Sequence, residues 1–247
     1  MTSAISMRRG LVVPSIAAAC AFALLIGLGT WQVERKAWKE ALIATVSERF
    51  AAPPAALPRP AEWARLAPAT DEFRRVRFTA ELLNDKEALV YTTGSSLHGG
   101  DLGPGYWVLT PARVGDSIVM VNRGFVPQDR KDPASRPQGE IAGPLEIVGV
   151  MRWPEQPGLF TPAADPAKNL WFARDSSAIA QAKGLTSVAP FYVEQEAPPA
   201  PGGLPQAGAL QPSFPNNHLG YAITWYGLAL VLAGSFSVWF AGRLRGA

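Results

Sequence analysis

The run LGYAITWYGLALVLAGSFSVWFA, Leu219 to Ala241, contains no charged residue and decides the architecture of this 247-residue chain. A helix of about 20 apolar residues crosses the ~30 Å hydrocarbon core of a bilayer. A second such run, LVVPSIAAACAFALLIGLGTWQV, extends from Leu11 to Val33. Its Pro14 falls in the first turn, where a missing backbone N–H does no harm. The sequence therefore predicts two transmembrane helices, 11–33 and 218–241.

The first run can also be interpreted as a cleaved signal peptide, because it follows a basic start and contains the small residues AAACAFA. Against this interpretation, the run continues through LLIGLG to Trp31, which is longer than a typical signal-peptide core. We therefore expect an uncleaved anchor. The segment of about ten residues before it is too short for an amphipathic mitochondrial presequence. The expected location is a bacterial inner (plasma) membrane.

The distribution of charge predicts how the two helices are oriented. Segments 1–10 and 242–247 carry four arginines and no acidic residue, whereas all 20 acidic residues lie between the two runs. Short basic segments stay in the cytoplasm, so both termini are expected there and residues 34–217 form a periplasmic domain. That domain holds 19 of the 23 basic residues and is near neutral. The net charge of +3 therefore comes from the basic terminal segments, which indicate membrane orientation. We expect no nucleic-acid partner.

The domain between the helices is predicted to be α+β, with an antiparallel sheet and one or two helices. Segment 34–50 has the apolar periodicity of an amphipathic helix that continues the first membrane helix outward. A short helical turn follows Pro60, and a later helix is capped by Asp175 and stopped by Gly184. Runs rich in β-branched and aromatic residues predict strands at 74–83, 88–94, 105–112, 117–126, 144–153 and 191–196. No βαβ alternation appears, which argues against a Rossmann-type nucleotide site.

The sequence of this domain contains none of the common catalytic motifs. G-x-S-x-G, H-E-x-x-H and a phosphate-binding loop are all absent from it. The only cysteine, Cys20, lies in the first apolar run, so no intramolecular disulfide can form. The carboxylate pairs at 71–72 and 194–196, and His98 in a glycine-flanked loop, are interpreted as solvated surface groups. We expect no catalytic residue and no enzymatic activity.

His218, at the start of the second apolar run, is the candidate binding residue. A neutral imidazole is a standard axial ligand of haem iron, and an ionisable group beside a membrane is a functional hypothesis. Tyr221 and Trp225 share its helical face and could flank a flat porphyrin. Alternatively, His218 caps the helix together with Asn216 and Asn217, and the aromatic rings form an interfacial belt. The spacing leaves both interpretations open.

Small residues at regular spacing predict that the two membrane helices pack closely. The proposed contact rows are Gly220, Gly227 and Gly234 on the second helix, with Ala19, Ala23 and Gly27 on the first.

Three motifs in this order resemble the surfeit locus protein 1 family of cytochrome c oxidase assembly factors. They are W-Q-x-x-R-x-x-W-K after the first run, N-R-G-aromatic-V-P in the domain, and N-H-L-x-Y-A-x-T-W at the second run. The shorter stretches GYWVLTPA, WFARD and APFYVE add to the resemblance, which extends from Gly29 to about Leu230. Phe125 stands where the family often has Trp, so any hydrogen bond from a Trp N–H is in doubt.

The resemblance implies a membrane-embedded factor that helps the catalytic subunit of a haem-copper oxidase mature, either by holding haem a or, without haem, as a structural scaffold. The proposed haem ligand of the family corresponds to His218, and the matching Tyr221 and Trp225 are carried over only as structural or partner-contact residues. Expected partners are the oxidase catalytic subunit, haem a synthase and the lipid bilayer. The remaining motif positions, expected to be structural or to contact partners, are Trp31, Gln32, Arg35, Asn122, Arg123, Gly124 and Pro127. For Arg123 we expect an internal salt bridge in preference to a haem propionate.

Overall fold

The computed structural model describes residues 2–93, 103–208 and 216–245, with side chains described from Leu11 onward. His98 lies outside these residues. The chain divides into a helix pair, Met1–Thr45 with Ser213–Ala247, and a β-domain, Val46–Pro212. The two units are described separately below.

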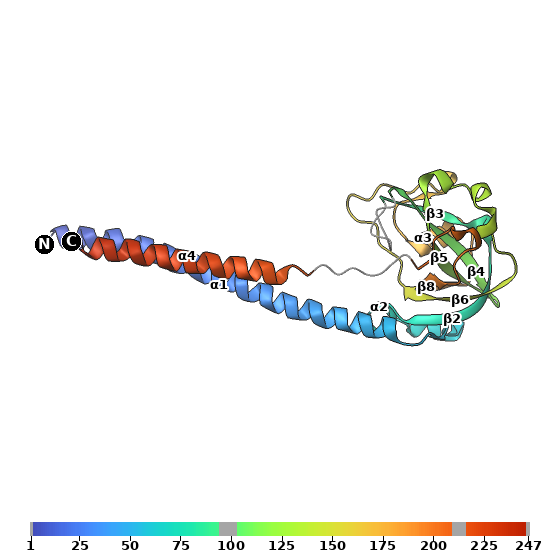
Figure 1. Ribbon diagram of the computed structural model, residues 1–247, viewed down its shortest axis with the longest axis horizontal. Coiled ribbons are helices and arrows are strands. Elements are labelled where there is room, and N and C mark those ends of the chain that lie inside the picture. Colours follow the sequence, from blue (N-terminus) through green and yellow to red (C-terminus); the bar gives the residue numbers. More distant parts are fainter. Residues whose placement is uncertain (1, 94–102, 209–215, 246–247) are drawn as a thin grey trace. The chain divides into compact units, whose positions relative to one another are not determined.

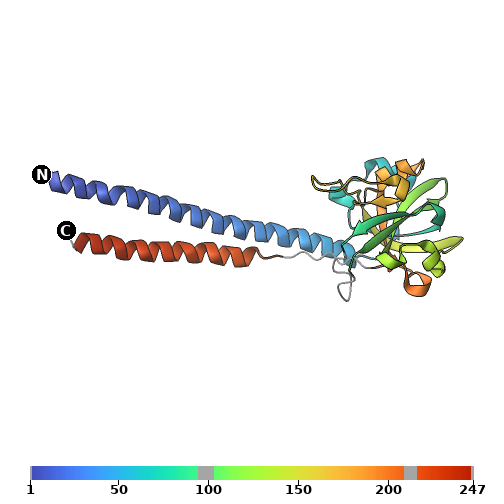
Figure 2. The same ribbon diagram turned by 90° about the horizontal axis from the view of Figure 1, so that it is seen from above.

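The helix pair consists of α1 (Thr2–Ala51) and α4 (His218–Arg245), which lie side by side (Figures 1 and 2). Helix α1 continues without a break past the predicted span into segment 34–50, as predicted. Both helices are long and apolar enough to cross a membrane. Their apolar side chains remain uncovered by protein, for example Leu24 (64% exposed) and Val238 (75% exposed). This exposure fits a membrane protein, because lipid and not protein would cover these side chains.

The contact between the two helices differs from the predicted glycine rows. A Cβ placed on Gly27, Gly220, Gly227 or Gly234 would meet no other atom within 4 Å, so these glycines face open space. The buried residues of α4 are Ala222 and Ala229, and on α1 a Cβ at Gly29 would lie 2.7 Å from the ring of Tyr226. Alanine therefore supplies the small side chains on α4, and Gly29 makes room for a large ring. The prediction of close packing along the glycine rows was wrong.

The β-domain is built on one sheet that closes into a barrel (Figure 1). Strands β2, β6, β8, β5 and β4 are hydrogen-bonded in this order, and β4 pairs again with β2. The strands are β1 (Ala55–Ala56), β2 (Arg75–Leu82), β3 (Ala88–Thr92), β4 (Gly105–Val114), β5 (Ser117–Pro127), β6 (Pro144–Arg152), β7 (Leu170–Trp171) and β8 (Val188–Ala197). Strands β3 and β7 extend the sheet beyond β4, and β1 extends it beyond β2. Closure gives each of the five barrel strands a neighbour on both sides, and β1 and β7 are the outermost strands of the sheet.

All six predicted strands and the predicted helices are present. The predicted turn after Pro60 is the 3₁₀ helix Pro60–Arg65, and a short helix α2 (Pro68–Asp71) follows it. Helix α3 (Ser176–Ala182) begins after Asp175, whose side chain accepts from the Ala178 N–H at 3.0 Å. The pairings β1–β2, β3–β7 and β5–β8 are parallel and the others antiparallel. The α+β prediction is confirmed, with these parallel pairings added to a mainly antiparallel sheet.

The buried apolar side chains of the β-domain form three clusters: an inner core within the barrel, an outer core, and a small third cluster of Tyr106, Val108 and Val126. Along β2, buried residues from Val76 to Leu82 alternate with more exposed ones, as expected for a strand with one face inward. On β8, Phe191 and Val193 belong to this inner core, whereas Tyr192 belongs to an outer core that α3 covers. Glu194 lies two residues after Tyr192 and therefore on the same outer side. This alternation places the carboxylate of Glu194 beneath the segments that cover the outer side of the barrel, including the one that contains Arg174.

Gly124 of the N-R-G motif adopts a conformation that suits only glycine. Its φ is 119°, and a Cβ there would lie 2.0 Å from the carbonyl oxygen of Gln206. Backbone hydrogen bonds join Phe125 to Gln206 in both directions, at 2.8 and 3.1 Å. The Asn122 side chain also accepts from the Gly124 N–H at 3.2 Å. The glycine therefore allows a second chain segment to approach the end of β5.

We expect Gly124→Ala to lower the free energy of unfolding by about 2–4 kcal/mol, because both backbone strain and a backbone clash oppose the methyl group. The matched control is Gly115→Ala, where φ is +58° but a Cβ would meet no atom within 4 Å. Strain alone should cost that variant about 1–2 kcal/mol. Chemical denaturation of both variants measures the difference, and equal losses would show that the approach of Gln206 does not matter.

Candidate functional site

The candidate ligand His218 forms a hydrogen bond across the helix pair. Its Nδ1 lies 2.7 Å from Oε1 of Gln32, a residue of α1 that is only 9% exposed. An amide oxygen can only accept a hydrogen bond, so Nδ1 must carry the proton. In a neutral imidazole the other ring nitrogen, Nε2, then keeps its lone pair. The contact therefore selects the tautomer that can ligate a metal through Nε2.

A second polar contact joins the same two helices further along. The hydroxyl groups of Thr30 and Tyr226 lie 3.1 Å apart, and the ring of Tyr226 packs over Gly29. As numbering falls on α1 it rises on α4, so the helices are antiparallel. Hydrogen bonds of this kind stabilise helix pairs in membranes by about 1 kcal/mol each. Together with the buried Ala222 and Ala229, they fix the register in which His218 meets Gln32.

The other two candidate residues lie near His218 with different exposures. Tyr221 is 57% exposed and Trp225 is partly buried, so both are accessible from outside the helix pair. Asn216, just before the helix, has a buried side-chain oxygen without a partner among the described residues. The ring of His218 is hydrogen-bonded to Gln32, and among the described residues no hydrogen bond joins this ring to a backbone N–H of α4.

These residues fit haem better than a bare metal ion. Among the described residues, no group of three His, Cys, Asp or Glu side chains is placed to hold a metal ion. Haem brings four nitrogen ligands of its own and needs one axial protein ligand. His218 offers one such nitrogen, accessible aromatic rings lie on the same helix, and the orphaned oxygen of Asn216 lies two residues away.

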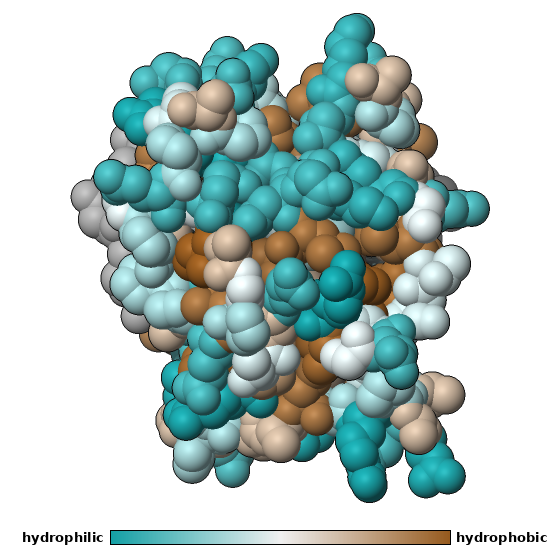
Figure 3. All heavy atoms as spheres, turned by 90° about the vertical axis from the view of Figure 1, so that its right-hand side faces the viewer, coloured by the Kyte–Doolittle hydropathy of each residue, from teal (hydrophilic) through white to brown (hydrophobic). Residues whose placement is uncertain are grey.

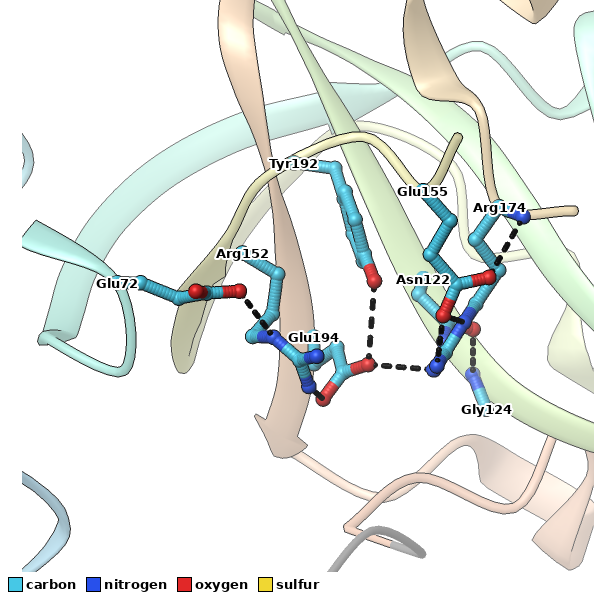
Figure 4. Close-up of polar contacts among 8 residues, drawn as sticks. All are labelled: Glu72, Asn122, Gly124, Arg152, Glu155, Arg174, Tyr192 and Glu194. Atoms are coloured by element: carbon cyan, nitrogen blue, oxygen red, sulfur yellow. Dashed lines mark hydrogen bonds and ion pairs between the residues drawn. The ribbon is translucent and has the colours of Figure 1, made fainter. Parts of the chain in front are cut away.

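A different polar cluster lies on the outer side of the barrel (Figure 4). The carboxylate of Glu194, at 8% exposure, accepts from Arg174 at 2.7 Å and from Arg152 at 3.3 Å. Arg152 also binds Glu72 at 3.1 Å, and Arg174 binds Glu155. We call these residues, with Tyr192, the arginine–glutamate network. It connects β8, the end of β6 and the segments that cover the outer side of the barrel.

Burial dominates the electrostatics of this network. It raises the pKa of Glu194, and the guanidinium groups of Arg152 and Arg174 oppose that rise. For Glu155 burial also favours the neutral acid, but hydrogen bonds and charge from Arg174 outweigh it and lower the pKa. Burial likewise raises the pKa of Tyr192, so its phenol stays neutral at physiological pH. The network therefore holds alternating charges of opposite sign around a neutral hydroxyl group.

This arrangement suits a structural role. Each carboxylate of the network has an arginine partner, so none is left as an uncommitted general base. The interpretation of 71–72 and 194–196 as solvated surface was wrong. Glu194 is buried and Glu72 binds Arg152. Glu196 binds Arg75 at 2.9 Å, and Asp71 lies 3.8 Å from Arg74. A pocket of about 180 Å³ lies elsewhere in the domain and shares no residue with the network. Its lining residues are Arg130, Ser135, Arg136, Pro137, Gln138, Pro201, Gly202 and Leu204.

Arg123 of the N-R-G motif does not form the predicted salt bridge. No described carboxylate lies within 4.0 Å of its guanidinium group, which donates to the Gly139 carbonyl oxygen. Its other contact, to the Asn84 side chain, is long at 3.5 Å, and its Nε has no partner among the described residues. The residue is 1% exposed, and burial lowers its pKa. Arg123 is thus a core residue whose guanidinium group donates to a backbone carbonyl oxygen.

Comparison with known proteins gives the chain its family. The family model described as "SURF1 family" matches residues 19–230, which is most of the chain. The chain belongs to the SURF1 family. Surfeit locus protein 1 of Rattus norvegicus is 34% identical to it over 235 residues, covering 90% of this chain and 73% of the relative. The Homo sapiens protein of that name is 34% identical over 233 residues, covering 89% and 74%. A SURF1-like protein of Monosiga brevicollis is 35% identical over 229 residues, covering 89% and 84%.

Motifs that are distant in this SURF1-family sequence meet in space. The W-Q motif contributes Gln32 to the contact with His218 of the N-H-L motif. WFARD contributes Arg174, which binds Glu194 of APFYVE. The Arg174–Glu194 pair was missed from the sequence, although the two-residue spacing of Tyr192 and Glu194 on a predicted strand could have suggested a shared buried face.

Proposed function

We propose that this SURF1-family protein is a non-enzymatic assembly factor for a haem-copper cytochrome c oxidase. In this proposal it binds haem a through His218 and assists insertion of the haem into the catalytic subunit. The observation that carries the proposal is the His218–Gln32 hydrogen bond of 2.7 Å, which leaves a lone pair on Nε2 at the end of an apolar helix. Family membership supports the assembly role through the resemblance described above.

The residues of α4 have separate tasks in this proposal. Bound haem a would supply an iron centre that can take an imidazole nitrogen as a ligand. His218 donates that nitrogen, while Tyr221 and Trp225 offer apolar and aromatic surface to the porphyrin. The contact between the two helices covers the Gln32 side of the imidazole, since Gln32 is 9% exposed. Transient binding suits a carrier, because a single protein ligand releases its cargo more readily than two.

The proposed location is the inner (plasma) membrane of a bacterium, with haem a synthase and the oxidase catalytic subunit as partners. Both termini lie in the cytoplasm, and the β-domain lies in the periplasm, between spans 11–33 and 218–241. The arginine-rich ends and the acid-containing centre of the sequence support this orientation. The apolar run that continues past AAACAFA to Trp31 supports an uncleaved anchor.

A second candidate function is a haem-free scaffold that stabilises the nascent oxidase subunit. Figure 3 shows a face of the β-domain on which hydrophobic side chains gather in the middle, with hydrophilic side chains around them. Such a rimmed apolar area is typical of protein–protein contact sites. In both proposals the β-domain would dock to the oxidase subunit. The two proposals differ in whether haem binds to α4.

Deleting the gene tests the assembly role. We expect the oxidase activity of membranes to fall, together with the haem a content of the purified catalytic subunit, and the native gene to restore both. The control is a second respiratory enzyme that contains no haem a, whose activity should stay constant. A fully active and fully haem-loaded oxidase in the deletion strain would contradict the proposal.

A further inference from the structure

We propose that Gln32 is a positioning residue for the haem site, and this inference rests on the proposed binding of haem by His218. The structure places a buried amide oxygen 2.7 Å from Nδ1 of the ligand imidazole, on the opposite helix. In metal sites, a hydrogen bond to the free ring nitrogen of a histidine fixes its tautomer and orientation and makes it a stronger ligand. Gln32 occupies that place relative to His218.

The burial of Gln32 shows that this contact is built into the helix pair. At 9% exposure it is the most buried polar side chain described on either helix, and burying an amide without a partner would cost several kcal/mol. Its oxygen meets the imidazole across 186 positions of sequence. A glutamine kept only for helix packing could be replaced by an apolar residue of similar length.

The hydrogen bond would act on the iron through the imidazole. A hydrogen bond donated by Nδ1–H to Gln32 increases the electron density at Nε2 and would make Nε2 a stronger ligand for haem iron. Loss of the acceptor would let the ring rotate or adopt the other tautomer, which has its proton on the ligating nitrogen. Gln32 would not touch the iron itself, so its effect on haem binding is indirect.

The competing explanation is that Gln32 only holds the two helices together. The hydrogen bond between Thr30 and Tyr226 provides the matched comparison, because it joins the same helices at 3.1 Å without touching His218. If helix association were all that mattered, removing either bond would change haem binding in proportion to the loss of thermal stability. If Gln32 positions the imidazole, removing its hydrogen bond should weaken haem binding more than removing the Thr30–Tyr226 bond does, for the same loss of thermal stability.

The experiment compares four forms of the full-length protein in detergent, co-produced with haem a synthesis. They are the native chain, Gln32→Met, Gln32→Glu and Thr30→Val. Met keeps the approximate length of the side chain without a strong acceptor, and Glu keeps the acceptor and adds negative charge. For each form we would measure haem retention on dilution, the reduction potential of the bound haem, and the melting temperature without haem.

Gln32→Met should weaken haem retention by about 10–100-fold, the usual effect of removing such a partner of a ligand histidine. Gln32→Glu should retain haem with a lower reduction potential, because a more anionic imidazole stabilises ferric iron. Thr30→Val should change the melting temperature and leave the potential unchanged. An unchanged potential in Gln32→Glu, or equal losses of haem in Gln32→Met and Thr30→Val at equal melting temperatures, would overturn the positioning role. Absence of haem from the native chain would instead overturn the proposed function.

Discussion

Replacing Arg174 by Met should lower the free energy of unfolding by about 3 kcal/mol or more, because it breaks a buried ion pair from one side. Glu194 loses its 2.7 Å partner and keeps Arg152 and a long contact of 3.5 Å from the Tyr192 hydroxyl group, while Glu155 loses the guanidinium group that lowers its pKa. Urea denaturation of the full-length protein in detergent, followed by the fluorescence of its tryptophans, measures the loss. The matched control is Arg59→Met, which removes an ion pair with Glu62 from a side chain that is 84% exposed. That control should change stability by less than about 1 kcal/mol.

The pH dependence of the Arg174→Met variant tests the cause of the loss. Burial already raises the pKa of Glu194, and removal of a guanidinium group raises it further. An acid with a raised pKa in the folded state contributes stability below its unfolded pKa and loses it as pH rises through the folded pKa. The difference between variant and native protein should therefore be smaller at pH 5 than at pH 8. A constant difference would show that lost packing, and not the unpaired carboxylate, destabilises the variant.

A double-mutant cycle assigns the energy to the pair itself. Glu194→Gln removes the charge and keeps the shape, so the combined variant with Arg174→Met should recover part of the loss. We expect a coupling energy of about 0.5–3 kcal/mol for groups in direct contact. Purely additive effects would contradict the structural role proposed for the arginine–glutamate network.

The secondary structure could be predicted from the sequence because its signals are local. Apolar length marks both helices, two-residue alternation marks β2, and Asp175 marks the start of α3. The parallel pairing of β5 with β8 could not be predicted, since it depends on how a long connection returns to the barrel.

The residues of the candidate site were only partly predictable. His218 could be identified because a histidine at the mouth of an apolar helix is unusual. Its partner Gln32 lies 186 positions away in the sequence. The contact between Glu194 and Arg174 depends on which face of β8 is covered by the segment that contains Arg174, and this is a property of the folded domain. The prediction for Arg123 was wrong because its guanidinium group donates to the carbonyl oxygen of Gly139 and has no described carboxylate within 4.0 Å. Such partners leave no trace in residue type or spacing.

His218→Ala should abolish haem binding, with the largest effect of any substitution considered for the helix pair. Removing a hydrogen-bond partner of a ligand costs about 10–100-fold in affinity, so removing the ligand itself should cost at least about 100-fold. The fold should survive, because Ala222, Ala229 and the Thr30–Tyr226 contact still hold the helices together. His98→Ala, which removes the only other histidine, is the matched control and should leave haem binding unchanged.

The most direct measurement is the optical spectrum of the detergent-purified protein, co-produced with haem a synthesis, for the native chain, His218→Ala and His98→Ala. The account predicts a haem band that copurifies with the native chain and with His98→Ala, and that is lost or shifted in His218→Ala. A native chain without haem, or a His218→Ala spectrum identical to the native one, would contradict a haem site at His218.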